Sequence, residues 1–587
     1  MQETSVFTGR KAAVVAALLP GALLGAHLGL LLFFLNPTLE LTSTVVLRGV
    51  ATLALAGGII GGAALALLAR GRPERLVAML PWGITAALAL AAAAQWTQAA
   101  HFAYYLPPGI NSRLLKAASG VSLVTLLCFY TALLHGMQRR RYGWRSRGGL
   151  ALLALLSLLL TAERRSAFPS PPPAPAEVGL RPRPAQTNLL VVALEGATLD
   201  AILPLAEQGQ LPFLATLLRQ GASGRVTTLS PPLRVAVWNS VATGAYPFRH
   251  GVVSDHTLDA PFLHPAAGLT LAPWGTGFAR WSRPLGVRVR DQPPRSSAPP
   301  LWRIFEGPGI STAVVGWPAA AASADDTPRT TVPESLFVEP DLPLSPTFAA
   351  AARIALELRP SLQSVDPAIL GALGGDLPSS VQEAVVADLW RASVARAFLD
   401  GEAAGGPTAI FVGLPGLLEV SRIAFGGFSA VQFDGSSRSD HRSSAQLVGG
   451  YYGLVDRLLA RMWANLPEPR LLALVAGHGV REPRRWRRIL SGLSPEISIE
   501  GRIDGEADGM LMLLGGNLRS GVVLPRTAIV DVAPTILYAM GQPVPRDGDG
   551  KVQTAAFGSA FLTRNPLTFV PSYAALAASS RGTVSSP

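Results

Sequence analysis

Five long apolar segments near the N-terminus constrain this chain more than any other feature of its sequence. They cover residues 12–35, 44–69, 76–100, 117–136 and 149–162. The first four reach the roughly 20 residues that a helix needs to cross the hydrocarbon core of a bilayer. The fifth is shorter, so it is either a fifth span or an interfacial helix. Residues 1–165 are therefore predicted to form a transmembrane helical region of four or five spans.

Positive charge is concentrated in alternate loops between these segments, which predicts their orientation. The residues concerned are Arg10, Lys11, Arg70, Arg72, Arg75, Arg139, Arg140, Arg141, Arg145 and Arg147. Short loops rich in Lys and Arg stay cytoplasmic, so the N-terminus is predicted to be cytoplasmic. With five spans, everything after Glu163 is predicted to lie outside the cytoplasm, on a bacterial inner or plasma membrane. The net charge of +12 is thus interpreted as membrane topology, and no nucleic-acid partner is expected.

A proline-rich stretch separates the apolar region from the rest of the chain. Residues 166–187 are predicted to be an extended linker, because dense proline favours polyproline structure over a packed element. Buried-type strands are expected at 188–194, 312–316, 409–412, 471–475 and 510–514, and a helix is expected at 202–220. Such alternation predicts an α/β domain over 188–575, with a mostly parallel sheet flanked by helices. The final residues 576–587 are predicted to be a disordered tail.

Five segments of this second region resemble a known family in order and spacing. They are VVALEGATLD from Val191, PPLRVAVWNS from Pro231, PPLWRIFEGPG from Pro299, AGHGV from Ala476 and IVDVAPTILYAMG from Ile529. They are similar to the type I phosphodiesterase and nucleotide pyrophosphatase branch of the alkaline phosphatase superfamily. The resemblance implies two divalent metals, commonly zinc, bound by Asp and His, and a Thr or Ser nucleophile between them.

The first two site positions of that family are changed in this chain. Glu195 stands where the resemblance implies the first metal-binding Asp, which keeps the charge but lengthens the side chain. Arg234 stands at the expected nucleophile position. A guanidinium is permanently charged and cannot attack phosphorus. The resemblance therefore implies no intact catalytic residue.

The remaining implied metal ligands are mostly missing. Residues 413–421 contain neither the Asp nor the His expected after the strand that ends at Val412. Gly477-His478 replaces the expected Asp-His pair, and the last expected His falls near Gly505. A metal site is thus predicted to be vestigial at most, formed by Glu195 and His478. The alternative is a site rebuilt from the neighbouring pairs Asp255-His256 and Asp440-His441.

Arg234 can also be interpreted as a replacement for the metal charge. If the fold brings it beside Glu195, an ion pair would preserve the shape of the site; otherwise Arg234 points to solvent. Arg234 and His478 are then candidates for binding an anion such as phosphate or sulfate without turning it over.

The preferred interpretation is a membrane-anchored pseudohydrolase with a binding or scaffolding role in the cell envelope and no cofactor. Its expected partners are membrane lipid, through the helices, and an envelope protein or an anionic ligand. The layout resembles lipoteichoic acid synthases and lipid A phosphoethanolamine transferases. The alternative is an active phosphodiesterase or phosphotransferase that uses zinc or another divalent metal on lipid-linked, glycan or nucleotide substrates. A transporter is disfavoured, because the spans contain no Asp, Glu or Lys that could form a relay.

Overall fold

The computed structural model of the chain describes most of its residues. Those that it does not describe are 1, 38, 40–41, 70–71, 139–142, 167–186, 255–256, 264–267, 274–281, 291–295, 307–309, 319–329, 338–348, 376, 403–407, 482–503 and 575–587. The predicted linker and the predicted tail therefore lie almost wholly outside the described residues.

The chain divides into two compact units. Unit 1 contains Met1–Pro172 and Ser254–Pro294, and unit 2 contains Pro173–Val253 and Arg295–Pro587. Residues 254–294 interrupt the segment predicted to be one α/β domain, and they group instead with the N-terminal helices.

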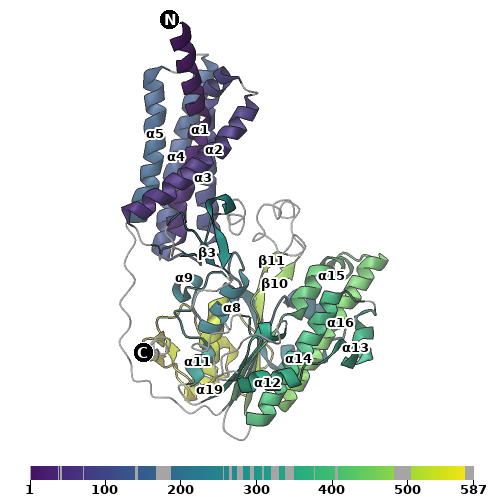
Figure 1. Cartoon of the computed structure of the whole chain (residues 1–587). Coiled ribbons are helices and arrows are strands. Elements are labelled where there is room, and N and C mark those ends of the chain that lie inside the picture. The colour runs from purple at the N-terminus through teal and green to yellow at the C-terminus, as the bar shows by residue number, and fades with distance from the viewer. Residues whose placement is uncertain are drawn as a thin grey trace. The chain divides into compact units, whose positions relative to one another are not determined.

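Unit 1 is built on five long helices (Figure 1). They are α1 (Gln2–Leu35), α2 (Ser43–Leu68), α3 (Pro73–His101), α4 (Pro108–Met137) and α5 (Trp144–Ser166). All five are long and apolar enough to cross a membrane, including the fifth, which offers 19 suitable residues. These helices support a membrane protein with five candidate spans.

Helices α1 and α2 pack closely through glycine. A Cβ atom at Gly25 would collide with the carbonyl oxygen of Leu53, and one at Gly57 would collide with that of Gly21. Small residues let two helix backbones approach at such distances, a common solution where helices meet within lipid.

The second part of unit 1 is a small antiparallel sheet attached to the end of α1. Its strands are β3 (Thr257–Asp259), β4 (Gly268–Leu269) and β5 (Arg288–Arg290), in the order β4-β3-β5. Asn36, the residue after α1, is buried and accepts hydrogen bonds from the backbone N–H groups of Thr270 (2.8 Å) and Leu271 (3.1 Å). Its amide also donates to the Leu271 carbonyl (2.6 Å). One side chain thus joins segments more than 230 residues apart in the sequence.

Unit 2 is organised around a nine-stranded sheet. Along its main path the strands are β13 (Val522–Val523), β2 (Ala222–Thr227), β12 (Gly509–Gly515), β9 (Arg470–Ala476), β1 (Asn188–Leu194), β8 (Thr408–Leu414), β6 (Ser311–Val315) and β7 (Thr330–Val332), while β14 (Thr527–Ala528) pairs with β2. The five strands from β9 to β7 are parallel, and β12 is antiparallel to both its neighbours. The predicted mostly parallel sheet is confirmed.

Helices cover both faces of this sheet. One group is α12 (Ala349–Glu357), α13 (Pro367–Leu373), α14 (Ser379–Glu402), α15 (Gly416–Gln432) and α16 (Ser439–Asn465). The other includes α8 (Arg234–Thr243), α11 (Leu301–Glu306), α18 (Val532–Ala539) and α19 (Ser559–Arg564). Figure 1 shows the first group gathered on one side of the sheet and α8, α11 and α19 on the other.

The prediction of a single helix at 202–220 is wrong. The structure has two helices there, α6 (Leu199–Glu207) and α7 (Pro212–Gln220). Gly209 takes a positive φ of 75°, a left-handed conformation that ends a helix, and Pro212 begins the next one.

Candidate functional site

The candidate site lies where the parallel strands of unit 2 end. Glu195 follows β1, His478 follows β9 and Glu334 follows β7 after one proline. Because parallel strands present their carboxyl ends at one edge of a sheet, loops far apart in the sequence place their side chains there.

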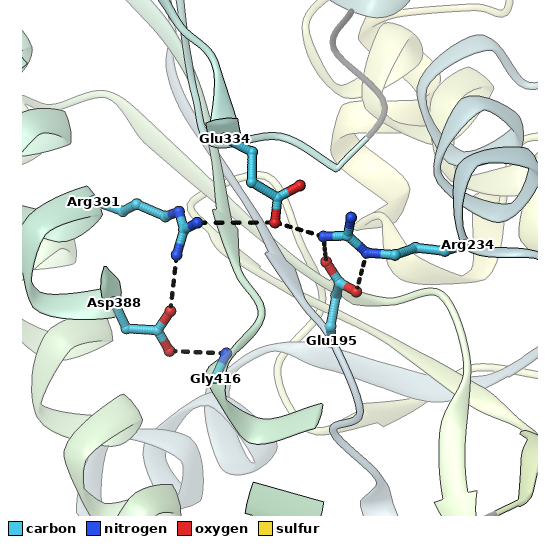
Figure 2. Close-up of polar contacts among 6 residues, drawn as sticks. All are labelled: Glu195, Arg234, Glu334, Asp388, Arg391 and Gly416. Carbon is cyan, nitrogen blue, oxygen red and sulfur yellow. Dashed lines mark hydrogen bonds and ion pairs between the residues drawn. The ribbon is translucent and has the colours of Figure 1, made fainter. Parts of the chain in front are cut away.

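Arg234 and Glu195 form a bidentate ion pair in this site (Figure 2). Arg234 Nε donates to Glu195 Oε2 at 2.8 Å, and its Nη2 donates to Oε1 at 2.7 Å. The Glu195 side chain is only 1% exposed, whereas that of Arg234 is 35% exposed. The first turn of α8 thus brings a guanidinium onto both oxygens of the buried carboxylate, and Arg234 does not simply point to solvent.

The ion pair belongs to a larger charged network that the sequence analysis did not identify. Arg234 Nη2 also donates to Glu334 Oε1 at 2.7 Å, and Arg391 Nη2 lies 3.8 Å from that oxygen. Arg391 Nη1 lies 3.6 Å from Asp388 Oδ1 on the same face of α14. Figure 2 shows the five side chains in a row, with two arginines between three carboxyl groups.

Asp388 is anchored from two further elements. Its Oδ2 accepts from the Tyr451 hydroxyl at 2.9 Å and from the Gly416 N–H at 3.2 Å. A Cβ atom at Gly416 would collide with the Tyr451 hydroxyl oxygen, so this position has no room for a side chain. Because Gly416 begins α15, the network also fixes the start of that helix.

Burial and neighbouring charges shift the pKa values of the two fully buried carboxyl groups in opposite directions. Burial alone would raise the pKa of Glu195, but the charge and hydrogen bonds of Arg234 outweigh it and lower that pKa. Burial raises the pKa of Asp388 to about 7, because Arg391 and the hydrogen bonds from Tyr451 and Gly416 offset it only in part. When Asp388 is protonated, the positive charges of the two arginines are balanced by the negative charges of Glu195 and Glu334.

His478 is buried close to this pair. Its Nδ1 lies 3.0 Å from the carbonyl oxygen of Gly479. Burial lowers its pKa, and the Glu195 carboxylate partly opposes that effect. The ring is therefore neutral at pH 7, and its contact with the Gly479 carbonyl favours the tautomer that carries the proton on Nδ1.

The described residues do not fit a pair of divalent metals. Both oxygens of Glu195 are engaged by Arg234. At Gly477, where the family has an Asp, a Cβ atom would collide with Val237 of α8, so packing has filled the space. Among the residues that the structure describes, no group of three or more His, Cys, Asp or Glu side chains could hold a metal ion.

The other candidate residues are engaged elsewhere. Asp440 pairs with Arg438 at 2.8 Å, while His441 Nδ1 lies 2.8 Å from Ser436 Oγ. Of residues 413–421, Glu419 pairs with Arg422 at 3.3 Å.

The alternative ligand pair Asp255-His256 lies outside the described residues. Gly505, near which the last metal-binding His is expected, lies in strand β11 (Asp504–Ala507).

The fold and site define an α/β domain with a mostly parallel sheet and a buried charged network at its carboxyl edge, in a chain that also has five candidate membrane spans. The family described as type I phosphodiesterase / nucleotide pyrophosphatase matches residues 189–489, more than half of the chain, and the chain belongs to this family. The resemblance noted from the sequence is thereby confirmed.

Several solved structures are similar to this chain. The phosphonate monoester hydrolase from Silicibacter pomeroyi is 16% identical, with 64% of this chain and 78% of that chain covered and a TM-score of 0.33. The murine ectonucleotide pyrophosphatase / phosphodiesterase 5 is 11% identical, with 62% of this chain and 98% of that chain covered and a TM-score of 0.36. The alkaline phosphatase PafA is 11% identical, with 65% of this chain and 100% of that chain covered and a TM-score of 0.40. No curated protein matches the chain. Similarity at this level does not extend to the reaction.

Proposed function

We propose that this protein is a membrane-anchored pseudohydrolase of the type I phosphodiesterase family, whose unit 2 binds or scaffolds other components of the cell envelope. One observation carries the proposal. Arg234 occupies the expected nucleophile position and uses two donors on Glu195, the carboxylate expected to bind metal. A guanidinium offers no nucleophile, and its fixed positive charge repels a metal cation.

Packing around the site supports the same proposal. Restoring the missing Asp at position 477 would require Val237 to move, because its side chain already fills the space of a Cβ atom there. Loss of one ligand is reversible by a single substitution, whereas position 477 would also need a change in the packing of α8. The arrangement suits a domain retained for its surface and its stability.

The proposed location follows from the five candidate spans and from the arginine-rich alternate loops. An odd number of spans with a cytoplasmic N-terminus would put unit 2 outside the cytoplasm of a bacterial cell. Fusion of a reporter that is active only in the cytoplasm to residue 574 tests this orientation. A reporter that is active there would refute it.

Metal content and turnover test the loss of catalysis. The full-length protein in lipid nanodiscs should bind less than stoichiometric zinc by mass spectrometry and should not hydrolyse bis-p-nitrophenyl phosphate, with an active family member assayed beside it. Stoichiometric metal together with turnover that disappears in Glu195→Gln would establish instead a metal-dependent phosphodiesterase.

Anion binding at Arg234 and His478 stays a prediction. Nε and Nη2 of Arg234 already donate to two carboxylates, so a bound anion would be contacted through Nη1, against the repulsion of Glu195 and Glu334. Thermal stabilisation by sulfate that is lost in Arg234→Ala would support such a site, and equal responses of both proteins would exclude it.

A further inference from the structure

A cavity of about 500 Å3 opens on unit 2 among α6, α13, α15 and α16. Its polar lining consists of side-chain amides and one guanidinium: Gln208, Gln210, Gln432, Gln446 and Arg457. This volume falls within the roughly 300–1,000 Å3 that is typical of small-molecule sites. We call it the amide cavity.

Three of the amides are ordered by hydrogen bonds to one another. Gln210 Nε2 donates to Gln208 Oε1 at 2.8 Å, and Gln208 Nε2 donates to Gln432 Oε1 at 3.3 Å. Each amide carries two donor hydrogens and two acceptor lone pairs. Within this set no amide donates or accepts more than one hydrogen bond, so each has donors and acceptors left for a ligand. The chain of amides thus presents preoriented donors and acceptors along one wall.

A glycine keeps the cavity open. Gly453 lies in the middle of α16, where glycine destabilises a helix relative to alanine. A Cβ atom there would meet only Arg457 Nη1, at 3.8 Å, so packing does not require glycine. By contrast, Gly450 in the same helix faces the Ala372 carbonyl, where a Cβ atom would come within 2.6 Å. Gly453 therefore leaves open space in the cavity that a larger side chain would occupy.

The chemistry of the lining selects the class of occupant. Among the described residues that line the cavity there is no carboxylate, and the only cation is Arg457. This excludes a metal and disfavours a polyanion. Hydroxyl groups both donate and accept hydrogen bonds, as amides do, so a sugar ring can pair with several glutamines at once. Leu205 and Phe428 of its lining are buried, and the apolar side chains that reach the surface, those of Ala372, Val431 and Ala445, are small, so they would hold a large peptide side chain poorly.

We propose that the amide cavity binds a neutral, hydroxyl-rich ligand, a segment of glycan. The proposal does not depend on whether the Arg234 site is catalytic. Neither the Arg234 network nor the membrane helices contribute to the lining.

The experiment measures binding of neutral hexasaccharides to the full-length protein in lipid nanodiscs, because a maltoside detergent would itself present sugar hydroxyls. Cellohexaose, chitohexaose, maltohexaose and mannohexaose are compared by saturation-transfer NMR and calorimetry. At least one should bind. Gly453→Leu should weaken that binding by at least about tenfold, because it removes room and several hydrogen bonds together.

Gly426→Leu is the matched control. Gly426 is also a helix-interior glycine, it is exposed on α15, and no atom lies within 4 Å of a Cβ built there. This variant should bind as the wild type does. Should Gly453→Leu fail to fold, the exposed Gln446→Ala provides the second test and should weaken binding about fivefold, the loss of one hydrogen bond.

Three results would overturn the proposal. None of the four sugars binds, or Gly453→Leu and Gln446→Ala both bind like the wild type, or an uncharged alanine-glycine hexapeptide binds more tightly than every sugar in a manner sensitive to Gly453→Leu.

Discussion

Replacement of Arg234 by methionine would leave Glu195 buried without its partner. Removing one member of a buried ion pair costs about 3–5 kcal/mol, because the remaining charge is uncompensated. Arg234 is 35% exposed, so water can reach the vacated position, and we expect about 2–3 kcal/mol of destabilisation. The entropy of unfolding scales with chain length, and for the roughly 370 residues of unit 2 this corresponds to about a 3 °C fall in melting temperature.

The effect should depend on pH in a defined direction. In the wild type the pKa of Glu195 is lowered from 4.5, so its contribution to stability is present above that value and is lost as pH falls. Without Arg234, burial raises the pKa of Glu195, and protonation then relieves the uncompensated charge as pH falls. The difference in melting temperature should therefore be larger at pH 8 than at pH 5.

Thermal unfolding of the full-length protein in nanodiscs, followed by tryptophan fluorescence, measures these differences. Arg225→Met is the matched control, because its ion pair with Asp200 is about half exposed and should contribute under about 1 kcal/mol. The double variant Glu195→Met/Arg234→Met should recover most of the loss, because two apolar residues replace the pair. A single variant as stable as the wild type at pH 8, or a double variant less stable than both single variants, would refute the reasoning.

Three further predictions concern other parts of the molecule. Asp388→Asn should flatten the dependence of the free energy of unfolding on pH between about 4 and 7. The raised pKa of Asp388 stabilises the wild-type fold at low pH, and this stabilisation is lost as pH rises, at up to about 1.4 kcal/mol per pH unit. Urea titrations at several pH values should show this slope only in the wild type. Gly25→Leu should abolish the close approach of α1 to α2 and lower the yield of folded protein in detergent, while Gly136→Leu on α4, where no atom lies within 4 Å, should not; equal yields would contradict the packing. Asn36→Leu should speed amide hydrogen exchange at Thr270 and Leu271 by at least about tenfold, because the lost acceptor protected both N–H groups, and unchanged exchange would show that other contacts hold the sheet.

The regular part of unit 2 was predictable from the sequence. The strand expected at 188–194 has those bounds in the structure, and the other four expected strands lie within a residue or two of β6, β8, β9 and β12. Continuous apolar runs bounded by turn residues leave little alternative to buried strands. The position of Glu195 followed from the end of the first strand, and that of Arg234 from the family motif around it.

The rest of the network was not predictable from the sequence in the same way. Glu334 follows a strand of three residues, and Asp388 and Arg391 lie in a helix where charged residues three apart usually face solvent. Their burial depends on Tyr451 and Gly416, which come from two other helices. No local pattern records such contacts.

The grouping of residues 254–294 with the membrane helices bears on how the protein can be divided. The polypeptide passes between the two units three times, at 172–173, 253–254 and 294–295. A protease that cuts the proline-rich linker would leave the five helices without a covalent link to the rest of the chain, and residues 254–294 would hold the two fragments together only through contacts such as those of Asn36. A gene fragment that starts at Asn188 would still encode the β4-β3-β5 sheet but not Asn36, and it would expose backbone N–H groups that the intact chain covers. Secretion of unit 2 as a soluble protein should thus succeed only if residues 254–294 are replaced by a short loop. The two ends of that loop are already close, because the Ser297 N–H donates a hydrogen bond to the His250 carbonyl.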